Sequence, residues 1–286
     1  MIVMLKTETY INLRYIPIAI CVLLPTTFVI TLAIALRLEH VDGIPYISDT
    51  GTYVPESCIF GQCLNIIAGF MCFLTFVRYS QIKEHAAVYK FSNSLLIWNI
   101  LGLILGIASS FGMSLVANFQ ETNVLSVHII GAILCFGGAT VYFWIQTICT
   151  YYLVPTICSM RLVVIRVIIS IFCTIFFISG MVTASLSKKS YQGTNPRKWK
   201  QEDGGWEYHV ISVCSEWIAA LVMSLYILTF AKDLNNCRLH STKIVFHSPC
   251  RRKLQVHNEM QNTENYSTFS ETKNPRILSF KIRNLK

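Results

Sequence analysis

Six long runs of apolar residues, nearly free of charge, alternate with shorter polar segments along the chain. Each run has 19–25 residues, and about 20 helical residues cross the hydrocarbon core of a bilayer. Backbone amides in lipid must form hydrogen bonds within their own segment, so each run is expected to be a helix. The pattern predicts an all-α polytopic membrane protein with six transmembrane helices in one bundle, spanning about 16–36, 59–77, 95–116, 124–148, 163–186 and 210–230.

The chain divides into a predicted transmembrane domain, residues 1–234, and a predicted tail, residues 235–286. The tail is rich in Lys, Arg, Ser, Thr and Asn and has no apolar periodicity, which is typical of a disordered segment. The first apolar run exceeds the core of about 7–15 residues found in signal peptides. We therefore expect that run to be retained as a helix.

An even number of spans places both termini on the same side of the membrane, and the distribution of basic residues decides which side. Eleven of the 24 Lys and Arg residues follow Phe230, and ten of these lie in the tail. The loop at 187–208 opposes this bias because it is also basic. The tail outweighs the loop, so we predict cytosolic termini and a cytosolic tail. The basic residues of the loop are Lys188, Lys189, Arg197, Lys198 and Lys200.

Composition also bears on the partners. The net charge is +9, but 53% of the residues are hydrophobic and much of the basic charge lies in the tail beside the membrane. Anionic headgroups are the natural partners of such a segment, so we expect contact with membrane lipids and none with nucleic acid. Gly102 and Gly106 have the spacing that lets two helices approach closely. Packing within the chain is the simpler interpretation, and a homo-oligomer formed through this face is the alternative.

Ionisable residues inside a span are costly and suggest function. Arg166 lies near the cytosolic end of its span and can extend to the headgroups, so no role is assigned to it. His128 lies near the outer end of its span. Glu216 lies about 9 Å along the last helix, with His209 two turns above it on nearly the same face. A proton relay or cation site is one interpretation, and a carboxyl that links neighbouring helices is the other.

Enzyme motifs are weak in this chain. Asp49-Thr50-Gly51 matches the tripeptide of aspartic proteases, but those enzymes need two carboxylates that share a proton. A tight turn is the better interpretation, since Asp and Gly favour turns. There is no zinc-protease helix motif, nucleophile elbow or phosphate-binding loop. We predict no catalytic residue, no metal site and no cofactor.

The tail contains one candidate sorting signal. Tyr266 and Phe269 are spaced as in tyrosine-based signals for endosomal or lysosomal delivery. Asn265 begins a glycosylation motif, which is a real acceptor only if the tail is lumenal. With a cytosolic tail we expect Asn265 to be unmodified.

Several motifs, in order along residues 15–235, carry a resemblance to a known family. They are Pro45-Tyr46-Ile47-Ser48-Asp49-Thr50-Gly51-Thr52, Pro55-Glu56-Ser57, Phe60-Gly61, Asn65-Ile66, the stretch from Gly112 to Gln120, His128 with Gly131-Ala132, Tyr208-His209-Val210, Glu216-Trp217, and Leu228-Thr229-Phe230 with Asp233. The chain resembles the damage-regulated autophagy modulator (DRAM) family. The resemblance implies a six-helix protein of lysosomal and other endomembranes that promotes autophagy, with some members linked to stress-induced cell death. The family's motif residues correspond here to Asp49, Glu56, Asn118, His128, His209 and Glu216.

The resemblance implies a non-enzymatic regulator of autophagy whose partners include autophagy or lysosomal membrane proteins. The alternative is a membrane-embedded lipid-modifying enzyme or transporter that uses outer-face carboxylates and histidines as acid–base or ion-binding groups. The wider superfamily's ties to lipid-anchor remodelling and lipid asymmetry keep that alternative open. No nucleophile–base pair can be identified in the sequence, which favours the regulator.

Overall fold

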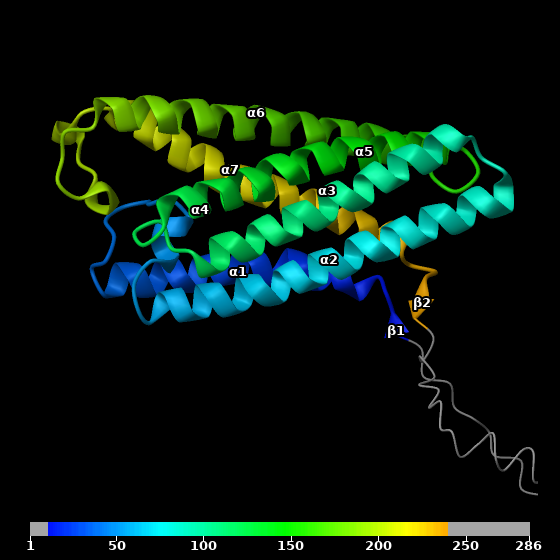
Figure 1. Ribbon diagram of the computed structural model, residues 1–286, viewed down its shortest axis with the longest axis horizontal. Coiled ribbons are helices and arrows are strands. Elements are labelled where there is room, and N and C mark those ends of the chain that lie inside the picture. The colour runs from blue at the N-terminus through cyan, green and yellow to red at the C-terminus, as the bar shows by residue number, and fades with distance from the viewer. Residues whose placement is uncertain (1–10, 240–286) are drawn as a thin grey trace, which may run out of the picture. The chain divides into compact units, whose positions relative to one another are not determined.

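The computed structural model describes residues 11–239, which form one compact unit. Six helical segments run along its length, each antiparallel to the one before (Figure 1). The predicted sorting signal at Tyr266 and Phe269 lies outside the described residues, as does most of the predicted tail. The membrane-length segments are α1 (Tyr15–Arg37), α2 (Glu56–Tyr89), α3 (Asn93–Asn118), the continuous stretch Leu125–Tyr152, α6 (Met160–Ser190) and α7 (Trp206–Asp233).

The prediction of an all-α bundle with six spans is confirmed. The clearest difference in bounds is in α2, which continues past the predicted end at Val77 to Tyr89. The added stretch is amphipathic, with Ile82 and Ala86 buried on one face. Such spacing at i and i+4 favours a helix whose apolar side packs on its neighbours. Average hydropathy finds the part of a helix that lies in lipid, and it misses this extension.

The fourth span contains a change of helix type. It consists of α4 (Leu125–Ala132), a π-helical turn η2 (Ile133–Gly137) and α5 (Gly138–Tyr152). Gly112 of α3 packs directly against this turn, because a Cβ there would lie 2.6 Å from the backbone nitrogen of Cys135. The Ser109 hydroxyl donates to the Cys135 carbonyl at 2.9 Å. A π turn disturbs the regular ladder of the helix, and α3 supplies a donor at that point.

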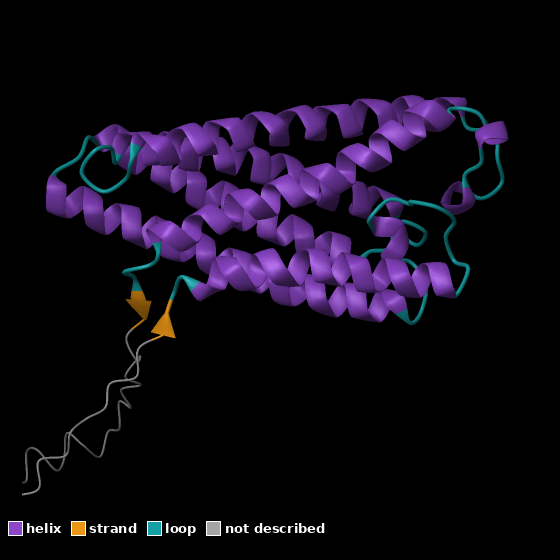
Figure 2. Ribbon diagram, turned by 180° about the vertical axis from the view of Figure 1, so that it is seen from behind, coloured by secondary structure: helices purple, strands orange, loops and turns teal. Residues whose placement is uncertain are grey.

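The bundle has two distinct ends. The loop end carries the connections 38–55, 119–124 and 191–205, with the short helical turns η1 (Ser48–Gly51), η3 (Pro196–Lys198) and η4 (Gln201–Asp203). The terminal end carries the connections 90–92 and 153–159. There β1 (Ile11–Asn12) pairs antiparallel with β2 (Arg238–Leu239), so the two ends of the described chain lie side by side (Figure 2).

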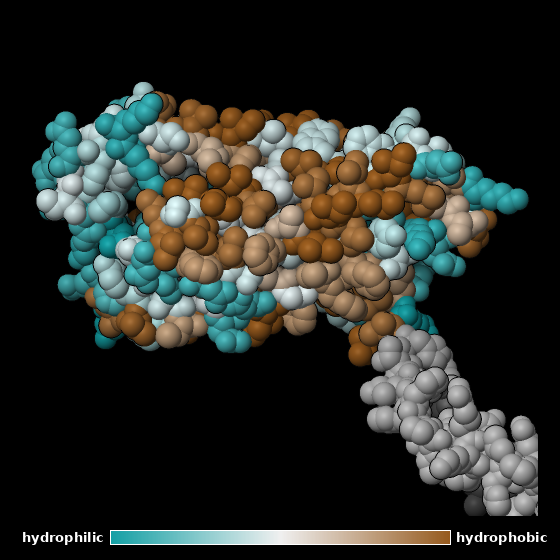
Figure 3. Space-filling view, viewed as in Figure 1, coloured by the Kyte–Doolittle hydropathy of each residue, from teal (hydrophilic) through white to brown (hydrophobic). Residues whose placement is uncertain are grey.

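Apolar side chains cover the outside of the bundle as well as its interior. In Figure 3 they gather over the middle of the visible face, while polar side chains gather at the loop end. Ile104, Ile175 and Leu225 are each more than half exposed. A surface of this kind is solvated by lipid, as the six spans require.

The small-residue face of α3 packs within the chain. A Cβ on Gly102 would lie 3.2 Å from side-chain atoms of Ile145 and Gln146, both on α5. A Cβ on Gly106 would lie 2.5 Å from the Thr75 side chain of α2. The expected close approach of helices through Gly102 and Gly106 is therefore present inside one chain. A homo-oligomer through the same face stays a prediction.

Candidate functional site

The connection 38–55 between α1 and α2, which we name the first loop, folds over the loop end of α7. The Trp217 indole donates to the Pro45 carbonyl at 2.8 Å, and the backbone N–H of Ile47 donates to Glu216 Oε2 at 3.1 Å. The predicted turn at Asp49-Thr50-Gly51 is the 3₁₀ turn η1. Its glycine is required, because a Cβ on Gly51 would overlap the ring of Phe60. These contacts place η1 directly above the last helix.

Residues of η1 help to line a hollow of about 1300 Å³ including its mouth. We name this hollow the loop-end chamber. It gathers three of the predicted site residues from three different elements: Asp49 from η1, His128 from α4 and Glu216 from α7. Carboxylates and basic groups face the same space. The other polar or aromatic residues that line it include Tyr46, Ser48, Glu121, Lys188, Tyr191, Arg197 and Trp199.

Asp49 is the most buried acidic group of the chamber, with 2% of its surface exposed. The backbone N–H of Tyr46 donates to its Oδ2 at 3.2 Å. Burial raises the pKa of Asp49 well above its usual value, and the nearby charges of Glu121 and Glu216 raise it further, while Arg197 opposes them. Asp49 therefore holds a proton at higher pH than a free carboxyl does.

His128 has a defined orientation. Its Nδ1 lies 2.7 Å from the Phe119 carbonyl oxygen, and a carbonyl can accept a hydrogen bond but not donate one. Nδ1 therefore carries the hydrogen. Its bond to the carbonyl of Phe119, the residue that follows α3, fixes the orientation of the ring. In the neutral ring this leaves Nε2 as the acceptor.

His209 lies beside the chamber in an aromatic enclosure. Its ring stacks on Trp199 with centroids 4.2 Å apart and meets the Tyr46 ring edge-on at 5.3 Å. The Tyr46 hydroxyl makes a short hydrogen bond with Ser212 of α7, and burial raises the pKa of Tyr46 to about 12. Tyr46 thus stays protonated and links the first loop to α7. His209 lines a neighbouring hollow that it shares with Asp49.

Two predicted site residues lie elsewhere. Glu56 is fully buried at the start of α2, and its Oε1 lies 2.5 Å from Nδ1 of His40. Asn118 is exposed and forms a reciprocal amide pair with Asn65, with both hydrogen bonds at 3.0 Å. Glu56 joins the first loop to α2, and Asn118 joins α2 to α3. Neither residue lines the chamber.

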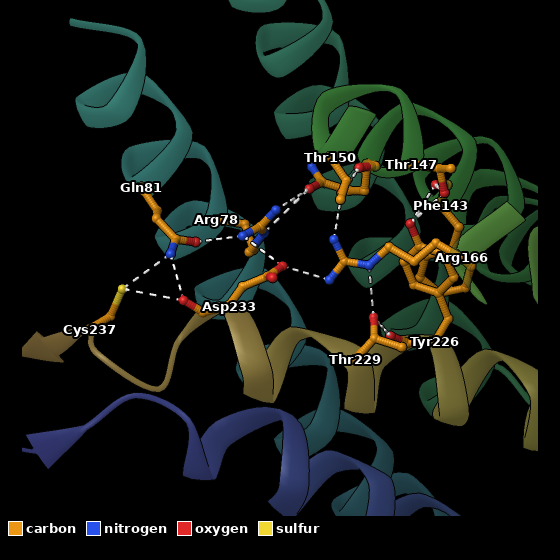
Figure 4. A network of polar contacts seen from close by, with 11 residues as sticks. Arg78, Gln81, Phe143, Thr147, Thr150, Arg166, Tyr226, Thr229, Asp233 and Cys237 are labelled. Carbon is orange, nitrogen blue, oxygen red and sulfur yellow. Dashed lines mark hydrogen bonds and ion pairs between the residues drawn. The ribbon is translucent and has the colours of Figure 1, made fainter. Parts of the chain in front are cut away.

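A second cluster of charge lies at the terminal end (Figure 4), and it corrects the expectation for Arg166. Arg166 does not extend to the headgroups but is fully buried, with Nη2 2.6 Å from Oδ2 of Asp233. Nη1 of Arg78 lies 3.0 Å from the same oxygen. A carboxylate at the end of α7 therefore neutralises arginine charge inside the bundle, which removes the need to reach water.

Amides and hydroxyls complete this network, which we name the terminal-end network. Arg166 donates to Thr150 at 2.5 Å and to Thr229 at 3.0 Å. Arg78 donates to Gln81 at 2.5 Å and to Gln146 at 3.4 Å. The network joins α2, α5, α6 and α7, and removing one charged partner from it would leave another buried charge unpaired. Its role is therefore structural.

Several chamber residues were not predicted. Glu121 lies in a short loop, Lys188 lies in the last turn of α6 and Arg197 lies in η3. The segment 187–208, which contains Lys188 and Arg197, was considered for its charge alone. The signal that could have found Arg197 is its place among aromatic residues in a long polar loop. Within residues 11–239 no group of three His, Cys, Asp or Glu side chains is placed to hold a metal ion.

These features define a class, namely a six-pass membrane protein with a polar chamber at one end and a closed charge network at the other. The matching family model is described as the Frag1/DRAM/Sfk1/Cwh43P N-terminal domain and covers residues 12–237. The chain belongs to this family. The resemblance expected from the motifs is thereby confirmed.

Curated relatives agree over most of the chain. It is 34% identical over 250 residues to human DNA damage-regulated autophagy modulator protein 2, covering 84% of this chain and 92% of the relative. It is 35% identical over 235 residues to human DNA damage-regulated autophagy modulator protein 1, covering 82% and 96%. It is 34% identical over 220 residues to the Xenopus laevis modulator of macroautophagy TMEM150B-B, covering 77% and 81%. None of these three names describes an enzyme or a transporter. No solved structure matches the chain.

Proposed function

We propose that this protein is a non-enzymatic modulator of autophagy that resides in lysosomal or related endomembranes. The observation that carries the proposal is the similarity of 34–35%, over most of the chain, to relatives named as modulators of autophagy or macroautophagy. The match includes the six spans and both polar clusters, since the family model extends from residue 12 to 237. Its partners are membrane lipids and autophagy or lysosomal membrane proteins.

The proposed orientation places both termini in the cytosol. It is supported by the eleven basic residues that follow Phe230 and by the general enrichment of Lys and Arg on the cytosolic side. The loop-end chamber then faces the lumen. The raised pKa of Asp49 suits that side, since an acidic lumen keeps a buried carboxyl protonated.

A loss-and-rescue experiment tests the function. Cells that lack the protein are compared with the same cells re-expressing it, under nutrient starvation and after DNA damage. Autophagic flux is measured as lysosomal degradation of a cytosolic reporter, with and without a lysosomal inhibitor. We expect lower flux without the protein and recovery on re-expression. Equal flux in both cell lines under both stresses would contradict the proposal.

Location and orientation are tested together with a C-terminal tag. We expect the tag to coincide with a lysosomal marker and to be cleaved by protease once the plasma membrane alone is permeabilised. A protected tag would reverse the orientation and make Asn265 a glycosylation acceptor.

The candidate sorting signal is tested by a substitution. Tyr266→Ala should leave the protein at the cell surface, and unchanged lysosomal delivery would refute the sorting signal.

A further inference from the structure

We infer that the loop-end chamber, together with two apolar hollows beneath it, forms a binding site for one membrane phospholipid with a zwitterionic headgroup. The headgroup occupies the chamber, and an acyl chain occupies the apolar space below. This inference goes beyond autophagy and does not depend on it.

Three hollows meet at one point of the bundle. Glu216 and Ala132 line all three of them, so the loop-end chamber is adjacent to the other two. The core hollow, of about 720 Å³ including its mouth, lies among α1, α2, α3, η2 and α7. The side hollow, of about 550 Å³ including its mouth, lies between η2, α6 and α7. The fixed polar groups thus lie next to two apolar hollows.

The apolar hollows suit an alkyl chain. Phe28, Met71 and Met223 are among the residues that line the core hollow, and flexible methionine side chains adapt to a chain of variable shape. Phe177 and Met181 of α6 line the side hollow. Sites of this kind, mostly apolar with a few fixed polar groups, are typical of small-molecule binding.

The side hollow can be reached from lipid. Met181 lines it and is 40% exposed, and its neighbour Val182 is 52% exposed on the outer face of α6. Lys188 follows on the same face of α6, about 10 Å farther along the helix at 1.5 Å per residue. A lipid whose chain enters beside Met181 therefore has its headgroup at the level of Lys188.

One side of the chamber carries positive charge. Lys188 and Arg197 both line it. Arg197 donates from Nη2 to the Tyr53 hydroxyl at 2.8 Å, and neither cation forms an ion pair within residues 11–239. Two cations without a carboxylate partner suit a phosphate group.

The other side offers acceptors. Glu121 and Glu216 line it with carboxyl oxygens, and the rings of Tyr46 and Trp199 flank the same space. Carboxylates attract an ammonium group by charge, and aromatic faces bind it through their ring electrons. Both signs of charge across one chamber favour a lipid with phosphate and ammonium over a purely anionic or purely cationic lipid.

Photolabelling of the full-length protein tests this site. The protein is placed in nanodiscs of phosphatidylcholine, of phosphatidylethanolamine or of phosphatidylglycerol, each with the same trace of phosphatidylcholine that carries a photoreactive acyl chain. In phosphatidylglycerol, which lacks the ammonium group and should compete weakly, we expect strong label on peptides of η2, α6 and α7. In phosphatidylcholine and phosphatidylethanolamine the bulk lipid should compete with the probe and reduce that label. Equal labelling in all three nanodiscs would indicate unspecific surface lipid and would overturn the inference.

Matched variants locate the headgroup and the chain. Arg197→Gln should reduce labelling about tenfold, the loss expected for one charge-assisted contact. Lys198→Gln, whose side chain pairs only weakly with Asp42 at 3.9 Å and does not line the chamber, should label normally. Ala132 lines all three hollows, so Ala132→Phe places a ring in the proposed site and should abolish labelling. Val182→Phe adds the same ring on the outer face of α6 and is the control, which should label normally.

The folded state of each variant is checked by its melting temperature and by size-exclusion chromatography. If Ala132→Phe does not fold, the pair Arg197→Gln and Lys198→Gln still decides, because both lie in a loop outside the bundle. Equal labelling of that folded pair would overturn the inference. Labelling needs no autophagy readout, so failure of either proposal leaves the other measurable.

Discussion

The two ends of the bundle both contain charged groups, but they use them differently. At the terminal end Arg78 and Arg166 contact Asp233 directly, and amides and hydroxyls meet the remaining donors. At the loop end Asp49 and Glu216 line a hollow that is adjacent to apolar hollows. In a closed network each charge has a partner within the protein, so removing one partner destabilises the fold. A chamber lined by charged groups can respond to protons or bind a ligand.

The largest expected effect is on the terminal-end network. Asp233→Asn leaves two buried arginines without their carboxylate, and breaking a buried ion pair costs about 3–5 kcal/mol. We expect a large fall in the free energy of unfolding, measured by denaturant titration in detergent. Glu202→Gln removes a carboxylate with a 79% exposed side chain and should leave that free energy unchanged. Equal stability of the two variants would remove the structural role of the network.

The second effect concerns the packing of α3 on the π turn. Gly112→Val places a side chain where a Cβ would already lie 2.6 Å from backbone, and overpacking of this kind costs about 1–3 kcal/mol. Gly69→Ala is the control, since nothing lies within 4 Å of a Cβ there, and it should stabilise α2 by about 0.5–1 kcal/mol. The comparison is made by thermal unfolding. A Gly112→Val protein as stable as wild type would contradict the role of this close contact in holding α3 against the π turn.

The third effect should separate stability from activity. Glu216→Gln keeps an oxygen that can accept the N–H of Ile47, now 3.1 Å from Glu216 Oε2, so the melting temperature should change little. Autophagic flux should fall if the carboxyl must exchange a proton or bind a cation. Full activity would end the proton-relay hypothesis. Loss of the folded state would instead support a carboxyl that links the first loop to α7.

The smallest effect is the pH dependence that Asp49 contributes. Its pKa is raised in the folded protein, so the folded state binds this proton more tightly than the unfolded state does. The resulting stability is complete below the usual value of 3.8 and is lost as pH rises through the raised folded value. Asp49→Asn should flatten this part of the stability–pH curve. Superimposed curves for wild type and variant would contradict the assignment.

The six spans could be predicted because lipid imposes a simple rule on length and polarity. The chamber could be predicted in part, since His128 and Glu216 stood out as polar groups inside apolar runs and Asp49 was indicated by the family resemblance. Its basic side could not, because Arg197 reaches the chamber through the fold of a long loop. Nothing local to that loop indicates which helices it will cover.

Arg166 shows the limit most clearly. The sequence places it near the end of a span, where extension to the headgroups is the cheapest solution for an isolated arginine. Its actual partner, Asp233, lies on another helix, and Arg78 on a third joins the same carboxylate. Long-range pairing of this kind depends on helix packing, and hydropathy carries no information about it. The same holds for Glu56, whose partner His40 lies across a loop.

The most direct test measures melting temperature and autophagic flux side by side for Asp233→Asn and Glu216→Gln, each re-expressed in cells that lack the protein. We predict that Asp233→Asn melts far below wild type, whereas Glu216→Gln melts near wild type and fails to restore flux. A Glu216→Gln protein that restores flux, or an Asp233→Asn protein that melts like wild type, would contradict the division between an end that stabilises and an end that acts.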